Sequence, residues 1–314
     1  MSGSAGTPAA PRIDIHQHLW TSRLIESLAE RRAPPLVACE QGAVILHTAS
    51  EAPYRIDVDG EAIDRRAALL TAGSLDGAAI MLSSPIGIEA LPREESLALI
   101  GAYLDGVSAL PAQFLVWVPI ALDRPVPADV DAALARGSIG ISIAAGAMTD
   151  GERLEEIGPI LERAAALDAP VFVHPGPAPG ERPIVARAGE PAWWQAMTAY
   201  VAQMQAAWLT FACFGRSLHP RLRIVFAMLA GGAPLLSERL QARSGPGIEL
   251  DDPRTFYETS SYGHAAVRAM VCRVGERQLV FGSDRPVIEP VLTGRDELLQ
   301  RNGGALLSRP AGAP

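Results

Sequence analysis

Short apolar runs alternate with longer amphipathic stretches along the chain, and from residue 61 the alternation continues to the end. This pattern is typical of βα units, in which a buried strand is followed by a helix that covers it. Because the apolar runs are continuous, we expect parallel strands that are buried on both faces. Eight runs have the length of strands, and they cover residues 12–16, 78–83, 114–120, 139–144, 170–174, 223–228, 255–260 and 278–283.

The stretches between these runs have the spacing of helices, and they include residues 93–110, 152–168, 234–243 and 264–275. Eight strand–helix units predict an α/β fold, a distorted (β/α)8 TIM barrel, for which about 250 residues is usual. An open, doubly wound sheet is the competing fold. It lacks support, because no strand is followed by a Gly-x-Gly-x-x-Gly turn and the units leave no remainder for a second domain.

Two stretches are longer than a minimal unit requires. Residues 33–60 carry proline and glycine around two alternating runs, which predicts a small β-hairpin insertion after strand 1. Residues 188–218 predict a long helical extension after strand 5, and its large apolar side chains near helical spacing indicate a buried helix face: Trp193, Trp194, Met197, Tyr200 and Met204. We expect a single barrel domain over residues 12–306, with flexible tails at 1–11 and 307–314.

Composition narrows the classes of function. The 314 residues are 48% hydrophobic and 20% charged, which suits a globular protein with a sizeable core. The net charge is −8 and the 27 cationic residues are scattered, so we do not expect a nucleic-acid partner. Every one of these cations is an arginine, which excludes Schiff-base chemistry, Walker-type phosphate binding and carboxylated-lysine metal bridges.

The cysteines and the apolar segments bear on the compartment. Cys39, Cys213 and Cys272 are odd in number, far apart and without Cys-x-x-Cys spacing, which fits a reducing compartment better than a disulfide framework. The N-terminus lacks the pattern of a signal peptide, and no apolar stretch reaches the roughly 20 residues that span a bilayer. We expect a cytoplasmic protein that does not enter a membrane.

Candidate chemistry begins with a pair of histidines at the end of the first strand. Residues i and i+2 of a strand point to the same side, so His16 and His18 project together from the carboxyl end, where barrel enzymes place their chemistry. Strand 5 ends at His174 and strand 8 ends at Asp284, which places both at the same rim. Three imidazoles and a carboxylate are ligands that Zn²⁺ accepts, as do Mn²⁺ and Fe²⁺.

At these residues the chain resembles the ACMSD-like branch of the amidohydrolase superfamily, also labelled amidohydrolase-2 or amidohydrolase-related. The segments "DIHQH", "VFVHPG" and "FGSDRP" are similar to that family's motifs on strands 1, 5 and 8, and residues 219–240 resemble its strand-6 segment. The resemblance implies a distorted (β/α)8 barrel with one catalytic divalent ion, most often Zn²⁺ or Mn²⁺, bound by His16, His18, His174 and Asp284. It also implies a homodimer or a larger assembly.

One position departs from that family pattern. The family has an acid–base histidine at the end of strand 6, where this chain has Met228, and a methionine cannot carry a proton. His264, directly after strand 7, lies on the loop face and is a candidate replacement, and Asp284 can combine metal binding with proton transfer. His219 precedes strand 6 and His47 falls in the insertion, so we expect structural roles for both.

Three further residues are substrate-binding candidates by position. Trp20 follows strand 1, Trp194 begins the long helical extension, and Arg285 follows Asp284. A tryptophan can wall a ring, and an arginine beside a metal can clamp a carboxylate, although Arg285 can equally bond to the backbone at the rim.

The interpretation that we prefer is a metal-dependent hydrolase that acts on an amide, ester or lactone bond of a small molecule through a metal-activated water. The first alternative is nonoxidative decarboxylation of an aromatic or unsaturated carboxylic acid. The second is a barrel that binds a metal or ligand but has lost catalysis, for which Met228 is the only support.

Overall fold

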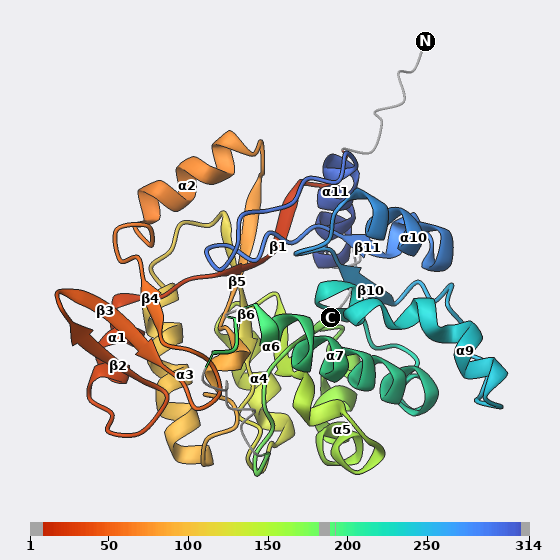
Figure 1. Ribbon diagram of the computed structural model, residues 1–314, viewed down its shortest axis with the longest axis horizontal. Coiled ribbons are helices and arrows are strands. Elements are labelled where there is room, and N and C mark those ends of the chain that lie inside the picture. Colours follow the sequence, from red (N-terminus) through yellow and green to blue (C-terminus); the bar gives the residue numbers. More distant parts are fainter. Residues whose placement is uncertain (1–8, 182–188, 192, 309–314) are drawn as a thin grey trace.

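Eight parallel strands form the centre of the computed structural model (Figure 1), which describes residues 9–181, 189–191 and 193–308. Each strand pairs with the next along the chain, as the sequence predicts for a (β/α)8 barrel. The fold prediction is therefore confirmed. In chain order, barrel strands 1 to 8 are β1 (Ile13–His18), β5 (Gly77–Met81), β6 (Phe114–Pro119), β7 (Gly140–Ala144), β8 (Val171–His174), β9 (Ile224–Phe226), β10 (Thr255–Glu258) and β11 (Leu279–Val280).

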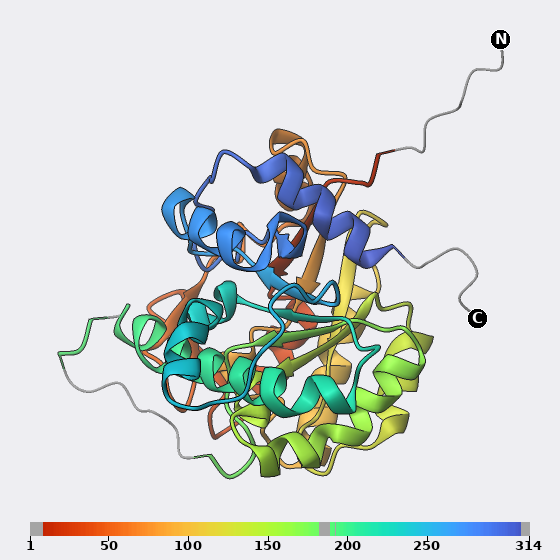
Figure 2. The same cartoon turned by 90° about the vertical axis from the view of Figure 1, so that its right-hand side faces the viewer.

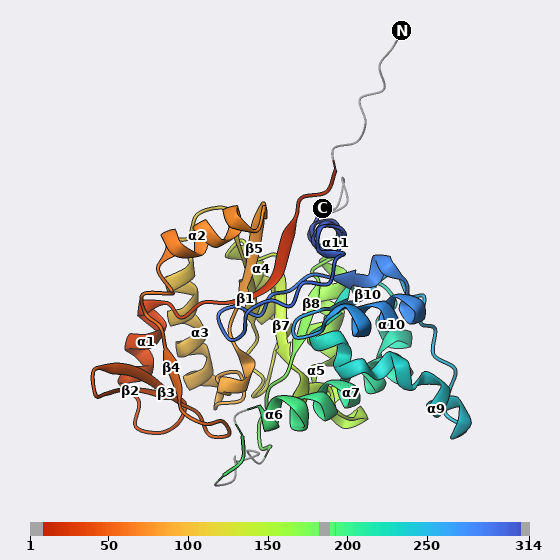
Figure 3. The same ribbon diagram turned by 45° about the horizontal axis from the view of Figure 1, so that its top comes forward.

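The barrel closes through the chain that follows β11, because that strand is only two residues long. The N–H of Ile15 donates to the carbonyl of Phe281 (3.0 Å), and the N–H of His18 donates to that of Arg285 (2.7 Å). In the opposite direction, the N–H of Asp284 donates to the carbonyl of His16 (2.9 Å). Residues 281–285, which follow the last barrel strand, thus lie beside the first strand, β1, and close the barrel (Figure 3).

Helices cover the outside of the barrel (Figure 2). The predicted helices 93–110, 152–168 and 264–275 are found as α3 (Arg93–Val107), α5 (Gly151–Ala166) and α10 (His264–Val274). Among the described helices, none combines the length and apolarity that a membrane crossing would require. The remaining elements of this layer are α1 (Ser22–Ala29), α2 (Ile63–Ala72), η1 (Ser84–Ile86), α4 (Pro127–Ala135), η2 (Ala145–Met148), η5 (Glu276–Gln278) and α11 (Asp296–Leu307).

The predicted helix 234–243 is correct only in its second half, α9 (Ser237–Ala242). It is preceded by η4 (Met228–Leu236), where the backbone turns left-handed over 228–232. Positive φ angles are unfavourable for residues with a side chain, so a regular helix cannot begin there.

The insertion after strand 1 is a three-stranded antiparallel sheet, one strand more than the predicted hairpin. Its strands are β2 (Leu36–Glu40), β3 (Ala43–His47) and β4 (Tyr54–Ile56), and they lie between α1 and α2 in the chain. Gln41 and Gly42 both have positive φ angles (51° and 79°), which is the backbone of a tight two-residue hairpin turn.

The extension after β8 is helical, as predicted, but it is broken into short pieces. These pieces are α6 (Trp194–Met197), α7 (Ala199–Thr210), η3 (Phe211–Gly215) and α8 (Arg216–Leu218). The interpretation of its apolar stripe as one buried face is wrong for Trp193, Trp194 and Met197, which are 58%, 43% and 64% exposed. The chain leaves helical geometry at Thr198, so the spacing that predicted one face does not run through the break. Met204, on α7, is fully buried.

Large aromatic side chains fill the barrel beneath its rim. Trp117 and Phe172 are fully buried with ring centroids 5.4 Å apart, and the indole N–H of Trp117 donates to the carbonyl of Ile15 (2.9 Å). The ring of Phe172 lies 5.2 Å from that of His16, so this core supports the first histidine directly. Of the two predicted tails, residues 1–8 and 309–314 lie outside the described part of the chain.

Candidate metal centre

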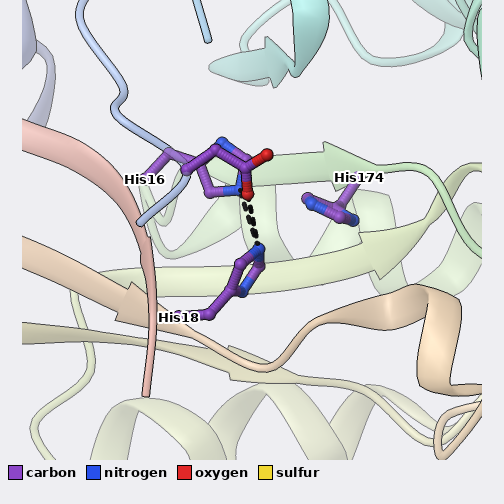
Figure 4. A group of neighbouring side chains, drawn as sticks. His16, His18 and His174 are labelled. Carbon is purple, nitrogen blue, oxygen red and sulfur yellow. Dashed lines mark hydrogen bonds and ion pairs between the residues drawn. The ribbon is translucent and has the colours of Figure 1, made fainter. Parts of the chain in front are cut away.

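Three imidazoles and one carboxylate meet at the carboxyl ends of the strands. His16 and His18 come from β1, His174 is the last residue of β8, and Asp284 follows β11. One ligand atom from each residue lies within 4.8 Å of the others, and the three rings point toward a common centre (Figure 4). The structure thus brings together the four residues that the sequence proposed as metal ligands.

The strand geometry explains why His16 and His18 face the centre while Gln17 does not. The side chain of Gln17 points the other way, and its amide oxygen accepts a hydrogen bond from the buried guanidinium of Arg66 (2.7 Å). The same guanidinium donates to the backbone carbonyl of His18 (2.8 Å). The carboxylate of Asp14, two residues before His16, accepts hydrogen bonds from the backbone N–H groups of His16 (3.1 Å) and Ser283 (3.0 Å). These contacts fix β1 against the segment that carries the fourth ligand.

Each histidine uses Nδ1 for a contact on the side away from the centre. Nδ1 of His18 bonds to the carbonyl of Met81 (3.1 Å), and Nδ1 of His174 bonds to that of Pro175 (2.8 Å). A carbonyl oxygen only accepts, so these nitrogens carry the proton and leave the Nε2 lone pairs free. Nδ1 of His16 lies 3.2 Å from Oε2 of Glu258, a carboxylate that favours the same tautomer.

The atoms at the centre have the separations of ligands around one small cation. Nε2 of His16 lies 3.2 Å from Nε2 of His18 and 3.6 Å from Oδ1 of Asp284, and Nε2 of His18 lies 3.1 Å from the same oxygen. Tetrahedral ligands about 2.0–2.1 Å from a zinc ion would be separated by about 3.3 Å. The spacing of these three residues therefore fits a divalent metal, and the ligand atom of His174 lies within 4.8 Å of them.

Burial sets the protonation of this cluster. It lowers the pKa of His18 and holds the pKa of His174 well below the usual 6.5, since a buried imidazolium lacks hydration. Burial is also the largest influence on the pKa of His16 and lowers it, but the carboxylates of Glu258, Asp284 and Asp14 together outweigh burial and the net shift is upward. Burial raises the pKa of Asp284, whereas interaction with His18, His16 and His174 in their protonated forms brings the pKa below its usual value in the metal-free protein. A carboxylate beside neutral imidazoles is the form that binds a divalent cation.

Glu258 is a residue that the sequence reasoning missed. It is the last residue of β10, it is fully buried, and its carboxylate contacts His16 rather than the centre itself. The sequence could have pointed to it, because Glu258 is a charged residue at the carboxyl end of an apolar strand. The same position identified His174 and Asp284.

The predicted catalytic residues occupy different places. Asp284 lies in the cluster, with 18% of its side chain exposed. His264 begins α10, is exposed, and its Nδ1 bonds to the carbonyl of Thr293 (2.9 Å), so it is outside the cluster. Its catalytic role stays a prediction. Met228 is partly buried, and its N–H donates to Oε2 of Glu258 (3.2 Å).

The predicted substrate-binding residues are also spread out, and their roles stay predictions. Trp20 is buried, with its ring 6.1 Å from that of Tyr54 in the insertion. Trp194 is exposed next to Trp193. Arg285 donates to the carboxylate of Glu289 (2.8 Å), which occupies one end of its guanidinium.

A pocket lies beside the loop that follows β8, although none of the four clustered residues lines it. Its volume is about 570 Å³, including space that opens to solvent. Gly176, two residues after His174, lines it, and the Gln203 side chain holds this glycine through its N–H (2.9 Å) and its carbonyl (2.8 Å). The other lining residues are Ala49, Ser50, Pro85, Ile86, Gly87, Pro177, Glu181, Gln195, Ala199 and Tyr200.

Two segments meet beside this pocket. The phenol of Tyr200, on α7, donates a hydrogen bond to Oε1 of Glu51, in the loop of the insertion. Burial raises the pKa of Glu51, and the negative charge of Asp284 raises it further, so this carboxyl group lies within electrostatic reach of the metal centre. The insertion and the helical extension therefore join across the mouth of the barrel.

Solved structures share this architecture. The chain matches an IDCase from Metarhizium anisopliae with a TM-score of 0.71 and 18% identity, over 97% of this chain and 92% of that one. It matches an amidohydrolase II with a TM-score of 0.68 and 14% identity, over 94% and 99% of the two chains. It also matches a 5-carboxyvanillate decarboxylase from Novosphingobium aromaticivorans, solved with manganese, with a TM-score of 0.62 and 16% identity over 99% and 93%.

The chain has the (β/α)8 barrel fold of these structures. No family model matches the sequence, and no curated protein does. At 14–18% identity the solved structures establish the fold alone, and they agree with the resemblance drawn from the strand-end motifs. Within this barrel, the four clustered side chains lie at the carboxyl rim, where (β/α)8 barrels place their chemistry.

Proposed function

We propose that this protein is a metal-dependent hydrolase of the amidohydrolase-2 type, acting on an amide, ester or lactone bond of a small organic molecule. The observation that carries the proposal is the convergence of His16, His18, His174 and Asp284, buried or nearly so, at the carboxyl rim of the barrel. Three neutral nitrogen donors and one carboxylate favour Zn²⁺, and Mn²⁺ also fits this set. When bound, such an ion polarises a carbonyl and lowers the pKa of a water toward about 7.

The chain's own residues divide the remaining tasks. Asp284 is held ionised by its histidine neighbours and is partly exposed, so it can accept a proton at the edge of the centre. The pKa of Glu51 is raised, and a carboxyl group with a raised pKa is suited to donate a proton to a leaving atom. His264 is the alternative donor. Either would replace the strand-6 histidine that is Met228 here.

The pocket favours hydrolysis of a neutral substrate. Among the described residues that line it, none is cationic, and Glu181 is acidic. Glu51 adds a second carboxyl group nearby. A substrate carboxylate would meet no arginine clamp from these residues, whereas an amide or lactone needs none.

A second candidate is nonoxidative decarboxylation of an aromatic or unsaturated acid. It is supported by the neighbouring structures, which include the manganese-bound 5-carboxyvanillate decarboxylase and a 2,6-dihydroxybenzoate decarboxylase from Rhizobium. In this reaction the same four residues would hold the ion, and a protonated side chain would deliver a proton to carbon.

One assay series separates these functions. The Zn²⁺- and Mn²⁺-loaded protein is tested against a panel of amides, esters, lactones and aromatic acids, next to Asp284→Asn and the outer-surface control Asp131→Asn. We expect hydrolysis products from the wild type and from the control, and a loss of at least about 100-fold in Asp284→Asn, which removes the general base. Release of CO2 would support the decarboxylase instead. Bound metal with no turnover of any compound would support a barrel that has lost catalysis.

A further inference from the structure

Glu258 is a fully buried carboxylate, and in the described structure it accepts hydrogen bonds from neutral backbone and hydroxyl groups. Its Oε1 accepts a hydrogen bond from the N–H of Ser260 (2.5 Å). Its Oε2 accepts from the hydroxyl of Ser260 (2.8 Å) and from the N–H of Met228 (3.2 Å), and it lies 3.2 Å from Nδ1 of His16. The three groups that hydrogen-bond to Glu258 are all donors, and the His16 nitrogen lies at ion-pair distance, which is an environment for a carboxylate rather than for a side-chain amide.

The barrel leaves space for this group. Gly282 follows β11, and a Cβ atom at this position would overlap the Glu258 carboxylate. Gly282 does not have a positive φ, so its lack of a side chain is needed for space and not for backbone conformation. The site is thus bounded by barrel strands 1, 6, 7 and 8, with β10 supplying the charge.

The three histidines differ in what holds Nδ1. His18 and His174 face the neutral carbonyls of Met81 and Pro175, whereas His16 faces the Glu258 carboxylate. A carboxylate behind a metal-binding imidazole fixes its tautomer and ring orientation, and makes the other nitrogen a stronger donor.

We infer that Glu258 is a positioning residue for the metal, holding His16 with its proton on Nδ1 and Nε2 directed at the ion. The inference rests on the proposed metal centre, and it adds a residue outside the four ligands. It also gives β10 a role next to Met228, where the chain departs from the family it resembles. Glu258 does not reach the centre, so it acts through His16.

Glu89 offers a matched control. It is also fully buried, and its Oε1 accepts a hydrogen bond from the hydroxyl of Ser84 (2.6 Å), but it contacts none of the histidines of the centre in the described structure. A glutamine at either position removes one buried carboxylate of similar exposure. Only the change at Glu258 removes a carboxylate that contacts a metal-binding histidine, His16.

The first test measures Zn²⁺ affinity by competition with a chromophoric chelator in wild type, Glu258→Gln, Glu258→Asp and Glu89→Gln, each checked for folding by circular dichroism. We expect affinity to fall about 10- to 100-fold in Glu258→Gln, to fall less in Glu258→Asp, and to stay within about 2-fold in Glu89→Gln. The absorption spectrum of the Co²⁺ form should change in Glu258→Gln only. Equal affinity in wild type and folded Glu258→Gln would overturn the inference, as would an equal loss in Glu89→Gln.

A second measurement needs no variant. In the ¹⁵N-histidine-labelled, Zn²⁺-loaded wild type, three metal-bound rings should each show a protonated Nδ1 and a coordinated Nε2. The reverse pattern in the ring assigned to His16 would overturn the role of Glu258 even if Glu258→Gln does not fold. A wild type that binds no divalent ion would instead contradict the proposed function itself, which separates the two failures.

Discussion

The histidines of the metal centre share one arrangement, with Nδ1 on an acceptor and Nε2 toward a common point. For His174 this arrangement is combined with deep burial and with two neighbouring histidines, so adding a proton is unfavourable. His174 therefore stays neutral and can bind a metal ion at a pH where a free histidine is protonated. We expect the stability of the metal-free protein to depend on pH for this reason.

The direction in which stability changes with pH follows from the number of protons that the folded and unfolded chains bind. Below pH 6.5 the unfolded chain protonates His174, while the folded protein does not until the pH reaches its lower folded-state pKa. The free energy of unfolding of the metal-free protein should therefore fall as the pH drops below 6.5, by up to about 1.4 kcal/mol per pH unit for this one group. Urea unfolding in the presence of chelator at pH 7.5 and pH 5.5 measures the change.

The matched variant for this experiment is His174→Asn, which removes the titrating group. We expect a smaller difference between the two pH values than in the wild type. His16 has the opposite shift and opposes part of the effect in both proteins, so the comparison between them is the decisive quantity. The same pH dependence in both would contradict the assignment.

Residue types at strand ends made four members of the cluster predictable from sequence, because side chains at i and i+2 share a face and parallel strands end at one rim. Glu258 obeys the same rule, but "YETS" carries no imidazole or known motif to draw attention to it. Its function depends on contacts with His16 and Gly282, which are far away in sequence. Such contacts are not visible in periodicity.

At the scale of elements, the two stretches that exceed minimal βα units meet each other. The insertion supplies Glu51 and the helical extension supplies Tyr200, and the hydrogen bond between them lies beside the pocket. Residues 49–53 of the insertion are half-buried or exposed, so a single hydrogen bond contributes noticeably to holding this loop.

We expect Tyr200→Phe to loosen the loop of the insertion. Loss of one hydrogen bond of about 0.5–1.5 kcal/mol should accelerate amide hydrogen exchange in residues 49–54 by roughly 2- to 10-fold, with no change in the barrel strands. Exchange followed by mass spectrometry measures this effect peptide by peptide.

Tyr103→Phe is the control for that measurement, since the Tyr103 hydroxyl is buried and has no hydrogen-bond partner in the described structure. It should leave exchange in residues 49–54 unchanged. Unaltered exchange in Tyr200→Phe would mean that the contact does not hold the insertion in solution.

Strands were easier to predict than the irregular elements. Continuous apolar runs identified all eight, whereas the third strand of the insertion and the left-handed turn at 228–232 depend on local backbone angles. The aromatic stripe after strand 5 failed for a related reason, because a break at Thr198 separates α6 from α7. Spacing predicts a face only while one helix continues.

At the scale of the whole molecule, the barrel core and the metal centre are one packed unit. Phe172 and Trp117 fill the barrel below the rim, Phe172 contacts the ring of His16, and Trp117 bonds to the backbone of β1. Shrinking a side chain here removes packing and support for a ligand at the same time.

Phe172→Ala should lower the free energy of unfolding of the metal-free protein by about 3–5 kcal/mol, because it leaves a cavity in a closed barrel. Urea denaturation with chelator present measures it. Phe214→Ala, at a 59% exposed site, should change stability by less than about 1 kcal/mol. Comparable losses in both variants would contradict the packing described for the core.

The metal content of the purified protein tests the central claim most directly. After loading with Zn²⁺ and removal of free metal by gel filtration, inductively coupled plasma mass spectrometry should find one ion per chain in the wild type. It should find much less than one in His18→Asn and in Asp284→Asn, both still folded by circular dichroism. A wild type that retains no divalent ion, or folded variants that retain as much as the wild type, would contradict the assignment of these four residues as a metal centre.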